Sequence, residues 1–413
     1  MVGTGCRRLP AVLLCAVLGA CTTAGGHPAA PSTRPIAGPA VSTPAASSSG
    51  ATSSGAASSG AGSSTAPDAL EARVSRALAT LDPRARVGQL FVAGVPLTDL
   101  AGGAAVVRSG VGGVFLAGRS TRSVADLASV TAAWQALTRG PRLWVAADQE
   151  GGQVQTLKGS GFARLPSALQ QGALGRPVLA GLAEGIGRSL HQAGLNLDLA
   201  PVADVVPAGT EATNQPIGQF DRQYGSTVAA VVGAAGTVRD ALAAEGVTAA
   251  LKHFPGLGRV RGNTDTASVT DTVTGPADAD VAVFGTLARS PAHPFVMVSS
   301  AVYARIDAAN PAAFSSTVLT TLLRGRLGFD GVIISDDMGI AAAVAGISPA
   351  NRAVRFFAAG GTLLLTVRPA IVPEMVDAVL ARTATDPAFA TQITAAEHTA
   401  LLAKARAGLL PPA

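Results

Sequence analysis

Residues 247–256 read Val-Thr-Ala-Ala-Leu-Lys-His-Phe-Pro-Gly, a short apolar run that ends in two basic side chains. A run of this kind, preceded by Gly246 and closed by Pro255 and Gly256, is typical of a strand buried on both faces of a parallel sheet. We therefore expect a buried strand that presents Lys252 and His253 at its carboxyl end.

Seven further runs of the same kind occur along the chain, and helical stretches separate them. In one stretch Ser123 is placed to cap a helix reaching about Arg139, with Asp126 at its third position. Eight strands alternating with helices predict an α/β fold, a single (β/α)8 TIM-type barrel. A doubly wound sheet gives the same alternation, but the count of eight favours the barrel. The expected strands are Val87–Val95, Val111–Ala117, Leu143–Ala147, Leu195–Pro201, Val247–Leu251, Pro294–Ser299, Gly331–Ser335 and Thr362–Val367.

Polar and ionisable residues follow five of these strands, while the strands themselves are apolar. Active-site residues of such barrels lie at the carboxyl ends of the strands, so these residues are expected to converge on one site. The strand ends read Asp148-Gln149-Glu150-Gly151-Gly152, Pro201 followed by Asp204, Lys252-His253-Phe254-Pro255-Gly256, Ser299-Ser300 and Ser335-Asp336-Asp337.

The first 66 residues differ in composition from the rest. Residues 1–21 combine two arginines, a short apolar run and Leu18-Gly19-Ala20-Cys21, which is similar to a bacterial lipobox and predicts a lipoprotein signal with Cys21 as the acylated residue. Residues 22–66 are almost wholly Ala, Gly, Ser, Thr and Pro, which predicts a disordered tether. Residues 67–413 form the expected barrel domain.

The overall composition excludes several classes of protein. The net charge of +5 is spread over 413 residues without a run of Lys or Arg, so we expect no nucleic-acid partner. No cysteine follows Cys21, which excludes disulfides and thiolate metal sites from the barrel domain. With five histidines and no His-x-His pair, a metal site has little support, and we expect no metal and no cofactor.

Two chemistries fit the polar strand ends. Lys252, desolvated inside a barrel, could form a Schiff base with a carbonyl substrate. Alternatively, paired carboxylates could act on a sugar, one as nucleophile and the other as general acid.

Four of these motifs together resemble glycoside hydrolase family 3, in particular its single-domain β-N-acetylglucosaminidases of the NagZ type. The resemblance covers most of residues 80–370, with the motifs in the family's order. They are Asp148-Gln149-Glu150-Gly151-Gly152, Leu199-Ala200-Pro201-Val202-Ala203-Asp204, Lys252-His253-Phe254-Pro255-Gly256 and Gly331-Val332-Ile333-Ile334-Ser335-Asp336-Asp337.

The resemblance implies a (β/α)8-type barrel and a retaining mechanism with Asp336 as the nucleophile. It implies that Asp148, Arg222, Lys252 and His253 bind the sugar, and this non-covalent role for Lys252 argues against the Schiff base. Asp337 has a simpler interpretation as a residue that caps the following turn.

The loop after residue 256 departs from the family pattern. Relatives carry an Asp-Ser-His string whose Asp-His pair is the general acid/base, but this chain reads Asp265-Thr266-Ala267. Three interpretations stay open: Asp265 is itself the acid/base, His293 on the sixth strand supplies the proton, or the protein binds sugar with little or no hydrolysis.

We therefore expect an exported, lipid-anchored β-N-acetylglucosaminidase on the outer face of the cell membrane, acting as a monomer on peptidoglycan-derived sugars. The alternatives are a weakly active or inactive sugar-binding envelope protein and a glycoside phosphorylase. Arg259 and Arg261 in the altered loop suit a phosphate nucleophile, although ordinary surface positions explain them as well.

Overall fold

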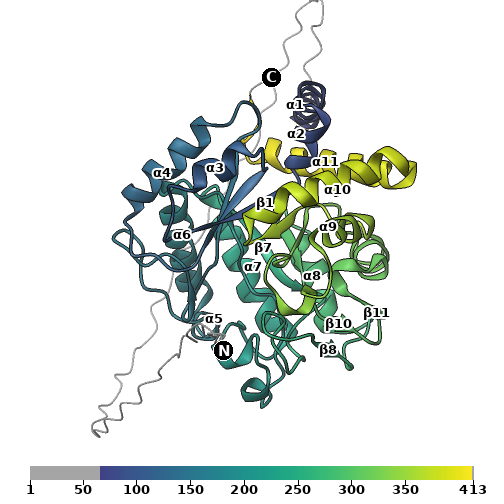
Figure 1. Ribbon diagram of the computed structural model, residues 1–413. Coiled ribbons are helices and arrows are strands. Elements are labelled where there is room, and N and C mark those ends of the chain that lie inside the picture. The colour runs from purple at the N-terminus through teal and green to yellow at the C-terminus, as the bar shows by residue number, and fades with distance from the viewer. Residues whose placement is uncertain (1–65, 412–413) are drawn as a thin grey trace, which may run out of the picture. The chain divides into compact units, whose positions relative to one another are not determined.

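The computed structural model describes residues 66–411, which contain a closed barrel of eight parallel strands (Figure 1). The strand order is β12-β9-β7-β6-β3-β2-β1-β13, and every neighbouring pair is parallel. The two ends of this order meet through a parallel bridge between Ile334 and Leu363, which closes the barrel. The predicted (β/α)8 fold is therefore confirmed.

All eight predicted strands correspond to barrel strands. Their interiors are buried because each strand faces packed side chains inside the barrel and helices outside it. The strands are β1 (Phe91–Pro96), β2 (Gly113–Ala117), β3 (Trp144–Ala147), β6 (Leu197–Asp198), β7 (Thr248–Phe254), β9 (Phe295–Val298), β12 (Ile333–Ser335) and β13 (Leu364–Thr366).

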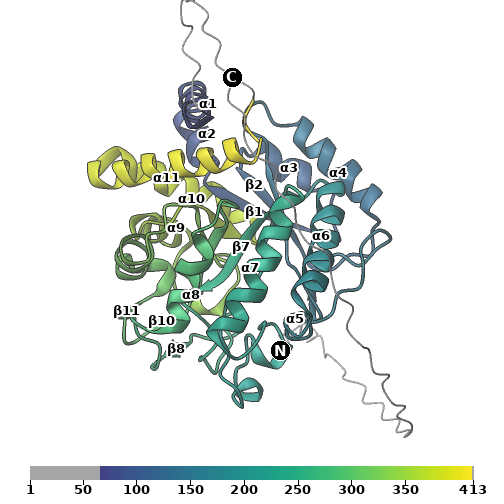
Figure 2. The same cartoon turned by 180° about the vertical axis from the view of Figure 1, so that it is seen from behind.

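A helical segment follows each barrel strand and lies on the outside of the barrel (Figures 1 and 2). In chain order these segments are α3 (Gly103–Arg108), α4 (Val124–Ala136), α6 (Arg176–Gln192), α7 (Val228–Ala244), α8 (Ala279–Ala288), the π-helical η4 (Thr317–Arg326), α9 (Pro349–Ala358) and α10 (Val372–Thr385). A short helix, α5 (Ala168–Gly172), precedes α6.

Helix α4 begins where the sequence predicts. The Ser123 side chain accepts from the backbone N–H of Asp126, and the Asp126 carboxylate accepts from the backbone N–H of Ser123. This reciprocal capping box satisfies two N–H groups that a helix start otherwise leaves unpaired.

The prediction that the first strand begins at Val87 is wrong. Val87 belongs to helix α2 (Pro83–Gly88), and strand β1 begins only at Phe91. Asp82 caps α2 by accepting from the backbone N–H of Ala85, and Pro83 occupies the first turn, where proline is tolerated. Val87 is thus buried as part of a helix, which a short apolar run does not distinguish from a strand.

Two small sheets and several helices were not predicted. The hairpin β4 (Gln149–Gly151) and β5 (Val154–Gln155) follows β3, and a sheet of β8 (Thr270–Asp271), β10 (Val302–Tyr303) and β11 (Asp307–Pro311) lies near the carboxyl ends of the barrel strands. Helices α3, α5 and α8 were among those missed. Strands of two residues are too short to show a hydrophobic period.

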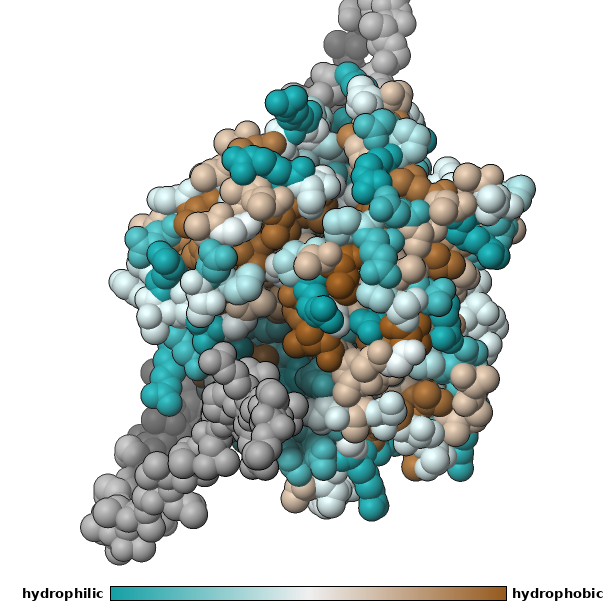
Figure 3. All heavy atoms as spheres, viewed as in Figure 1, coloured by the Kyte–Doolittle hydropathy of each residue, from teal (hydrophilic) through white to brown (hydrophobic). Residues whose placement is uncertain are grey.

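The two ends of the barrel differ. Helices α1 (Ala66–Thr80), α2 and α11 (Pro387–Arg406) gather at one end, whereas β8, β10, β11 and α5 lie at the other (Figures 1 and 2). On the face in Figure 3, hydrophilic and apolar residues are interspersed, and a hollow opens in the lower half.

The predicted signal peptide and most of the predicted tether lie outside the described residues, as does Cys21. Among residues 66–411, no helix combines the length and apolar character required to cross a membrane.

Candidate active site

One cavity of about 290 Å³ at the carboxyl ends of the strands is lined by all six side chains that the sequence singles out for catalysis or sugar binding. We call it the carboxyl-end cavity. These residues are spread over nearly 190 positions of the chain, and the barrel brings them together. They are Asp148, Arg222, Lys252, His253, Asp265 and Asp336.

The barrel strands position most of these groups directly. Asp148 is the first residue after β3, and Asp336 is the first after β12. Lys252 and His253 belong to β7 itself. Arg222 and Asp265 instead lie on connecting segments, where the hydrogen bonds of the loops decide their placement.

Lys252 is at the centre of a buried ionic network. Its Nζ lies 2.6 Å from Asp148 Oδ1 and 2.7 Å from Glu150 Oε1. The Arg222 guanidinium holds both oxygens of Glu150, with Nε at 2.9 Å and Nη2 at 2.7 Å, and its Nη1 donates to the Pro216 carbonyl. The network fixes Lys252 beside Asp148 at the cavity, and it occupies all three nitrogens of Arg222.

Glu150 is ionised in this network. Burial alone would raise its pKa, but the charges of Arg222 and Lys252 outweigh burial and lower the pKa to about 2. The Lys252 ammonium is stabilised in return: burial would lower its pKa, yet Asp148 and Glu150 raise it. Lys252 therefore stays charged and suits hydrogen bonding to hydroxyls rather than nucleophilic attack, which requires a neutral amine.

His253 is oriented by Asp204, a strand-end residue to which the sequence analysis gave no individual role. Asp204 is fully buried; its Oδ2 lies 2.8 Å from His253 Nδ1, and its Oδ1 accepts from the backbone N–H groups of His253 and Leu257. On the other side of the ring, Arg222 Nη2 lies 3.5 Å from Nε2. The imidazole ring is thus held between Asp204 and Arg222.

Asp336 has one oxygen available for chemistry. Its backbone N–H donates to Val298 O at 3.0 Å, which fixes the residue to the adjoining strand β9. Oδ1 accepts from the backbone N–H of Asp337 at 2.8 Å. Within the described part of the chain, Oδ2 has no hydrogen-bond partner, so a carboxylate oxygen facing the cavity is free to attack a substrate carbon.

Both carboxylate oxygens of Asp337, in contrast, accept hydrogen bonds from backbone N–H groups. Its Oδ1 accepts from Gly339 and Val367, each at 2.8 Å, and its Oδ2 accepts from Ile340 at 2.7 Å and Ala341 at 3.2 Å. These four bonds agree with the simpler interpretation of Asp337 as a residue that holds the following turn.

Asp265 lies on the loop that departs from the family pattern. Backbone bonds from Ala342 to Asp265 O and from Ala343 to Thr264 O attach the loop to the segment after β12. Asp265 keeps an exposed surface, but partial desolvation by its surroundings, and then the nearby charge of Asp336, raise its pKa, although His253 and Arg222 act in the opposite direction. A carboxyl group with a raised pKa suits proton donation to a leaving group.

The loop's other altered positions do not contribute an ionisable group to the cavity. Leu257 is buried and lines the cavity, whereas Ala267 is exposed and lies outside its lining. A histidine at position 267 would therefore need a rearranged loop to reach the sugar.

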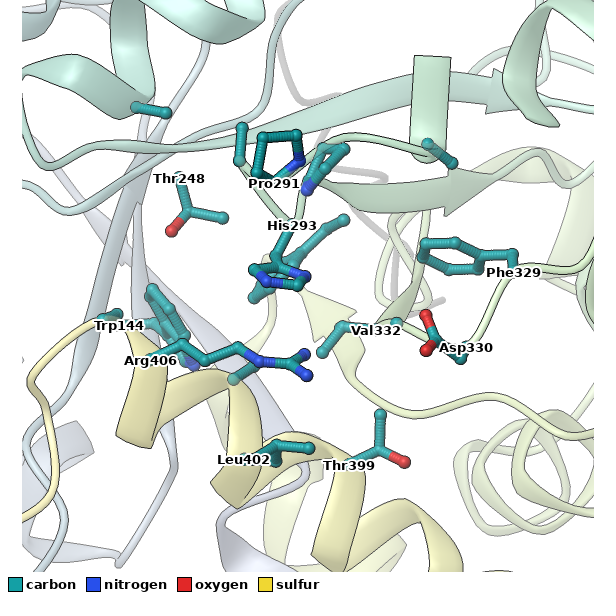
Figure 4. Close-up of a pocket in the computed structure, with 18 of the residues that line it drawn as sticks. Trp144, Thr248, Pro291, His293, Phe329, Asp330, Val332, Thr399, Leu402 and Arg406 are labelled. Atoms are coloured by element: carbon teal, nitrogen blue, oxygen red, sulfur yellow. The ribbon is translucent and has the colours of Figure 1, made fainter. Parts of the chain in front are cut away.

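His293 does not reach this cavity, so the hypothesis that it supplies the proton is wrong. It precedes the first residue of β9 and lines a second cavity, at the amino ends of the strands (Figure 4). The sequence showed that His293 is near the sixth strand, but the side chains that follow a parallel strand, not those that precede it, reach the active-site end.

Comparisons with known proteins agree with the fold. Residues 84–394 match the family model described as the glycosyl hydrolase family 3 N terminal domain. A beta-hexosaminidase of Xanthomonas campestris is 32% identical over 290 residues, covering 66% of this chain and 82% of the relative. The beta-hexosaminidase LpqI of Mycobacterium tuberculosis is 34% identical over 314 residues, covering 72% and 76%.

Among solved structures, a beta-N-acetylhexosaminidase from Beutenbergia cavernae is 44% identical and superposes with a TM-score of 0.75, covering 79% of this chain and 99% of the other. The matched range covers most of the barrel, including both the Ser-Asp-Asp segment at the end of β12 and the Lys-His segment of β7. This chain is a glycosidase that belongs to glycosyl hydrolase family 3.

Proposed function

We propose that this protein is a retaining β-N-acetylglucosaminidase that hydrolyses terminal N-acetylglucosamine from β-linked sugars. The observation that supports the proposal most is the free Oδ2 of Asp336 in the cavity that also holds Asp148, Lys252 and His253. The beta-N-acetylhexosaminidase activity named for the Beutenbergia relative supports the choice of sugar.

In the proposed reaction, Asp336 attacks the anomeric carbon while Asp265 protonates the departing glycosidic oxygen. A glycosyl-enzyme ester forms and the aglycone leaves as an alcohol. Asp265, now ionised, then removes a proton from water, which attacks the anomeric carbon and releases Asp336. Two inversions at the same carbon give a product that retains the configuration of the substrate.

The binding residues have separate tasks. The charged Lys252 and the free oxygen of Asp148 offer a donor and an acceptor to neighbouring sugar hydroxyls. His253 lines the cavity beside them, with its ring held by Asp204. Because Glu150 and Asp204 lock these groups before substrate binds, little conformational entropy is lost on binding.

The two alternatives have less support. A pure sugar-binding protein needs neither an unpaired carboxylate oxygen nor a second carboxyl group with a raised pKa in its cavity. For a phosphorylase, the loop arginines would have to attract phosphate. Arg259 instead pairs with Asp278 and Asp280, both at 2.6 Å, and lies outside the lining of the carboxyl-end cavity, as does Arg261.

The location, natural substrate and assembly state are also part of the proposal. The lipobox-like sequence ending at Cys21 supports an exported protein, anchored by a lipid on the outer face of the membrane. A protein so placed meets peptidoglycan fragments, which contain N-acetylglucosamine. We propose that it acts there as a monomer.

Release of an aryl group from its N-acetyl-β-glucosaminide, with and without added phosphate, tests the reaction type. The proposal predicts release of free N-acetylglucosamine at a rate that phosphate does not raise. Formation of the sugar 1-phosphate would identify a phosphorylase, and saturable binding of N-acetylglucosamine without any release would identify a sugar-binding protein.

A further inference from the structure

A second cavity is at the end of the barrel opposite the active site. It encloses about 510 Å³, and we call it the amino-end cavity. Its walls come from the first residues of β3, β7 and β9, from the turn before β12 and from the last turns of α11. This volume falls within the range of ordinary small-molecule sites.

Trp144 forms a buried part of this cavity. Its side chain is 1% exposed and packs edge-on against Phe295, with 5.1 Å between the ring centroids. The indole Nε1–H is buried and has no hydrogen-bond partner among the described residues. A buried donor left unpaired costs about 1–3 kcal/mol, so an acceptor inside the cavity would recover that energy.

Two further nitrogen donors face the same space. Figure 4 shows Arg406 extending across the cavity beneath His293, with Trp144 to one side and Asp330 to the other. Neither Arg406 nor His293 has a side-chain hydrogen bond or salt bridge within residues 66–411. Burial and then the charge of Arg406 lower the pKa of His293, so its imidazole is neutral near pH 7 and donates from one nitrogen.

The remaining walls limit what these donors can bind. Phe329, Val332 and Leu402 offer apolar surface. Asp330 places one negative charge on the far side, which disfavours a ligand with several negative charges. The matching ligand has one anionic acceptor group and an apolar body.

We propose that the amino-end cavity binds a small monocarboxylate with an apolar body, whose carboxylate accepts from Trp144 Nε1, His293 and Arg406. The ring or branched chain of the ligand packs on Phe329 and Leu402. This site is separate from the carboxyl-end cavity, because the two share no lining residue and lie at opposite ends of the barrel.

The chain contains only two tryptophans, which makes the central contact directly observable. In a proton–nitrogen NMR spectrum of the full chain, Trp134 and Trp144 each give one indole N–H signal, and Trp144→Phe assigns them. Benzoate is the probe, and benzamide is its uncharged counterpart. We expect benzoate to move the Trp144 signal saturably, with Kd on the order of 1 mM, and to leave the Trp134 signal in place.

Arg406→Gln removes the charge from an exposed side chain, so the fold is unaffected. We expect it to weaken benzoate binding about tenfold, since a hydrogen bond to a charged group contributes about that factor. Arg108→Gln is the matched control, because Arg108 is also exposed in the last turn of a helix and has no side-chain hydrogen bond in the described structure. His293→Asn tests the third donor and preserves the backbone, since φ is +46° at this position and asparagine tolerates that region.

One result would overturn the proposal: a Trp144 signal that does not move at about 20 mM benzoate, which is 20-fold the expected Kd. The cavity would then not bind benzoate. Equal affinity for benzoate and benzamide, or equal affinity in wild type and Arg406→Gln, would also overturn it. Because none of these measurements involves turnover of a glycoside, their outcome is independent of the proposed hydrolase activity.

Discussion

Replacing Asp198 with Asn tests the electrostatics beneath the active site. Asp198 ends strand β6 and is 1% exposed. Its Oδ1 accepts from the backbone N–H of Gln149 at 3.0 Å, but its buried Oδ2 has no partner among the described residues. Burial, which outweighs the Gln149 N–H and the charge of Lys252, raises the pKa from its usual 3.8 to about 7.

The size of the expected change in the free energy of unfolding follows from this pKa. The folded-state value lies above the unfolded one, so the unfolded chain releases this proton first, and wild-type stability falls as pH rises from about 4 to about 7. Each pH unit in that window costs about 1.4 kcal/mol, which gives about 4 kcal/mol at pH 8. Asparagine has nearly the shape of the protonated side chain and does not ionise, so Asp198→Asn avoids the cost.

Urea denaturation of both proteins between pH 4 and pH 8 measures the effect. We expect free energies of unfolding within about 1 kcal/mol of each other at pH 4 and a variant that is about 4 kcal/mol more stable at pH 8. Asp221→Asn makes the same chemical change at an exposed position and serves as the control. A pH-independent difference for Asp198→Asn, or a less stable variant at pH 8, would refute the reasoning.

Three further predictions concern other carboxylates and the leader. Asp337→Ala deprives four backbone N–H groups of their acceptor and is expected to lower the free energy of unfolding by roughly 3 kcal/mol or more; a loss below about 1 kcal/mol in urea denaturation would contradict its structural role. Asp265→Ala is expected to slow cleavage of a natural disaccharide far more than cleavage of a nitrophenyl glycoside, whose leaving group needs little protonation, and azide is expected to restore the latter; equal losses without rescue would remove Asp265 as the acid/base. Cys21→Ala is expected to release the processed protein from membrane fractions, and unchanged membrane attachment would contradict lipidation.

The barrel was predictable because a buried parallel strand is an uninterrupted apolar run, and all eight such runs became strands. Reading the carboxyl ends of those strands then identified Asp148, Lys252, His253 and Asp336, because these ends lie together at one end of a parallel barrel. The same logic placed Asp337, whose backbone contacts follow from its position at a tight turn.

Other parts of the site depend on contacts that periodicity does not encode. Glu150 and Asp204 stood in the quoted motifs, but only the folded chain shows that Glu150 joins Arg222 to Lys252 and that Asp204 holds His253. An acidic residue two positions after Asp148 on a buried segment was the available signal, because a buried carboxylate requires a cationic partner. For His293, proximity to a strand was not enough, since the end of the strand decides which cavity a residue reaches.

The central claim is that Asp336 is the nucleophile of a β-N-acetylglucosaminidase, and the turnover of an aryl N-acetyl-β-glucosaminide by wild type and Asp336→Asn tests it most directly. The amide keeps the shape of the side chain but loses the negative charge that attacks the anomeric carbon. We expect wild type to hydrolyse the substrate and the variant to be slower by at least about a thousandfold, a rise of about 4 kcal/mol in the barrier. A folded variant that turns over the substrate at nearly the wild-type rate would contradict the account.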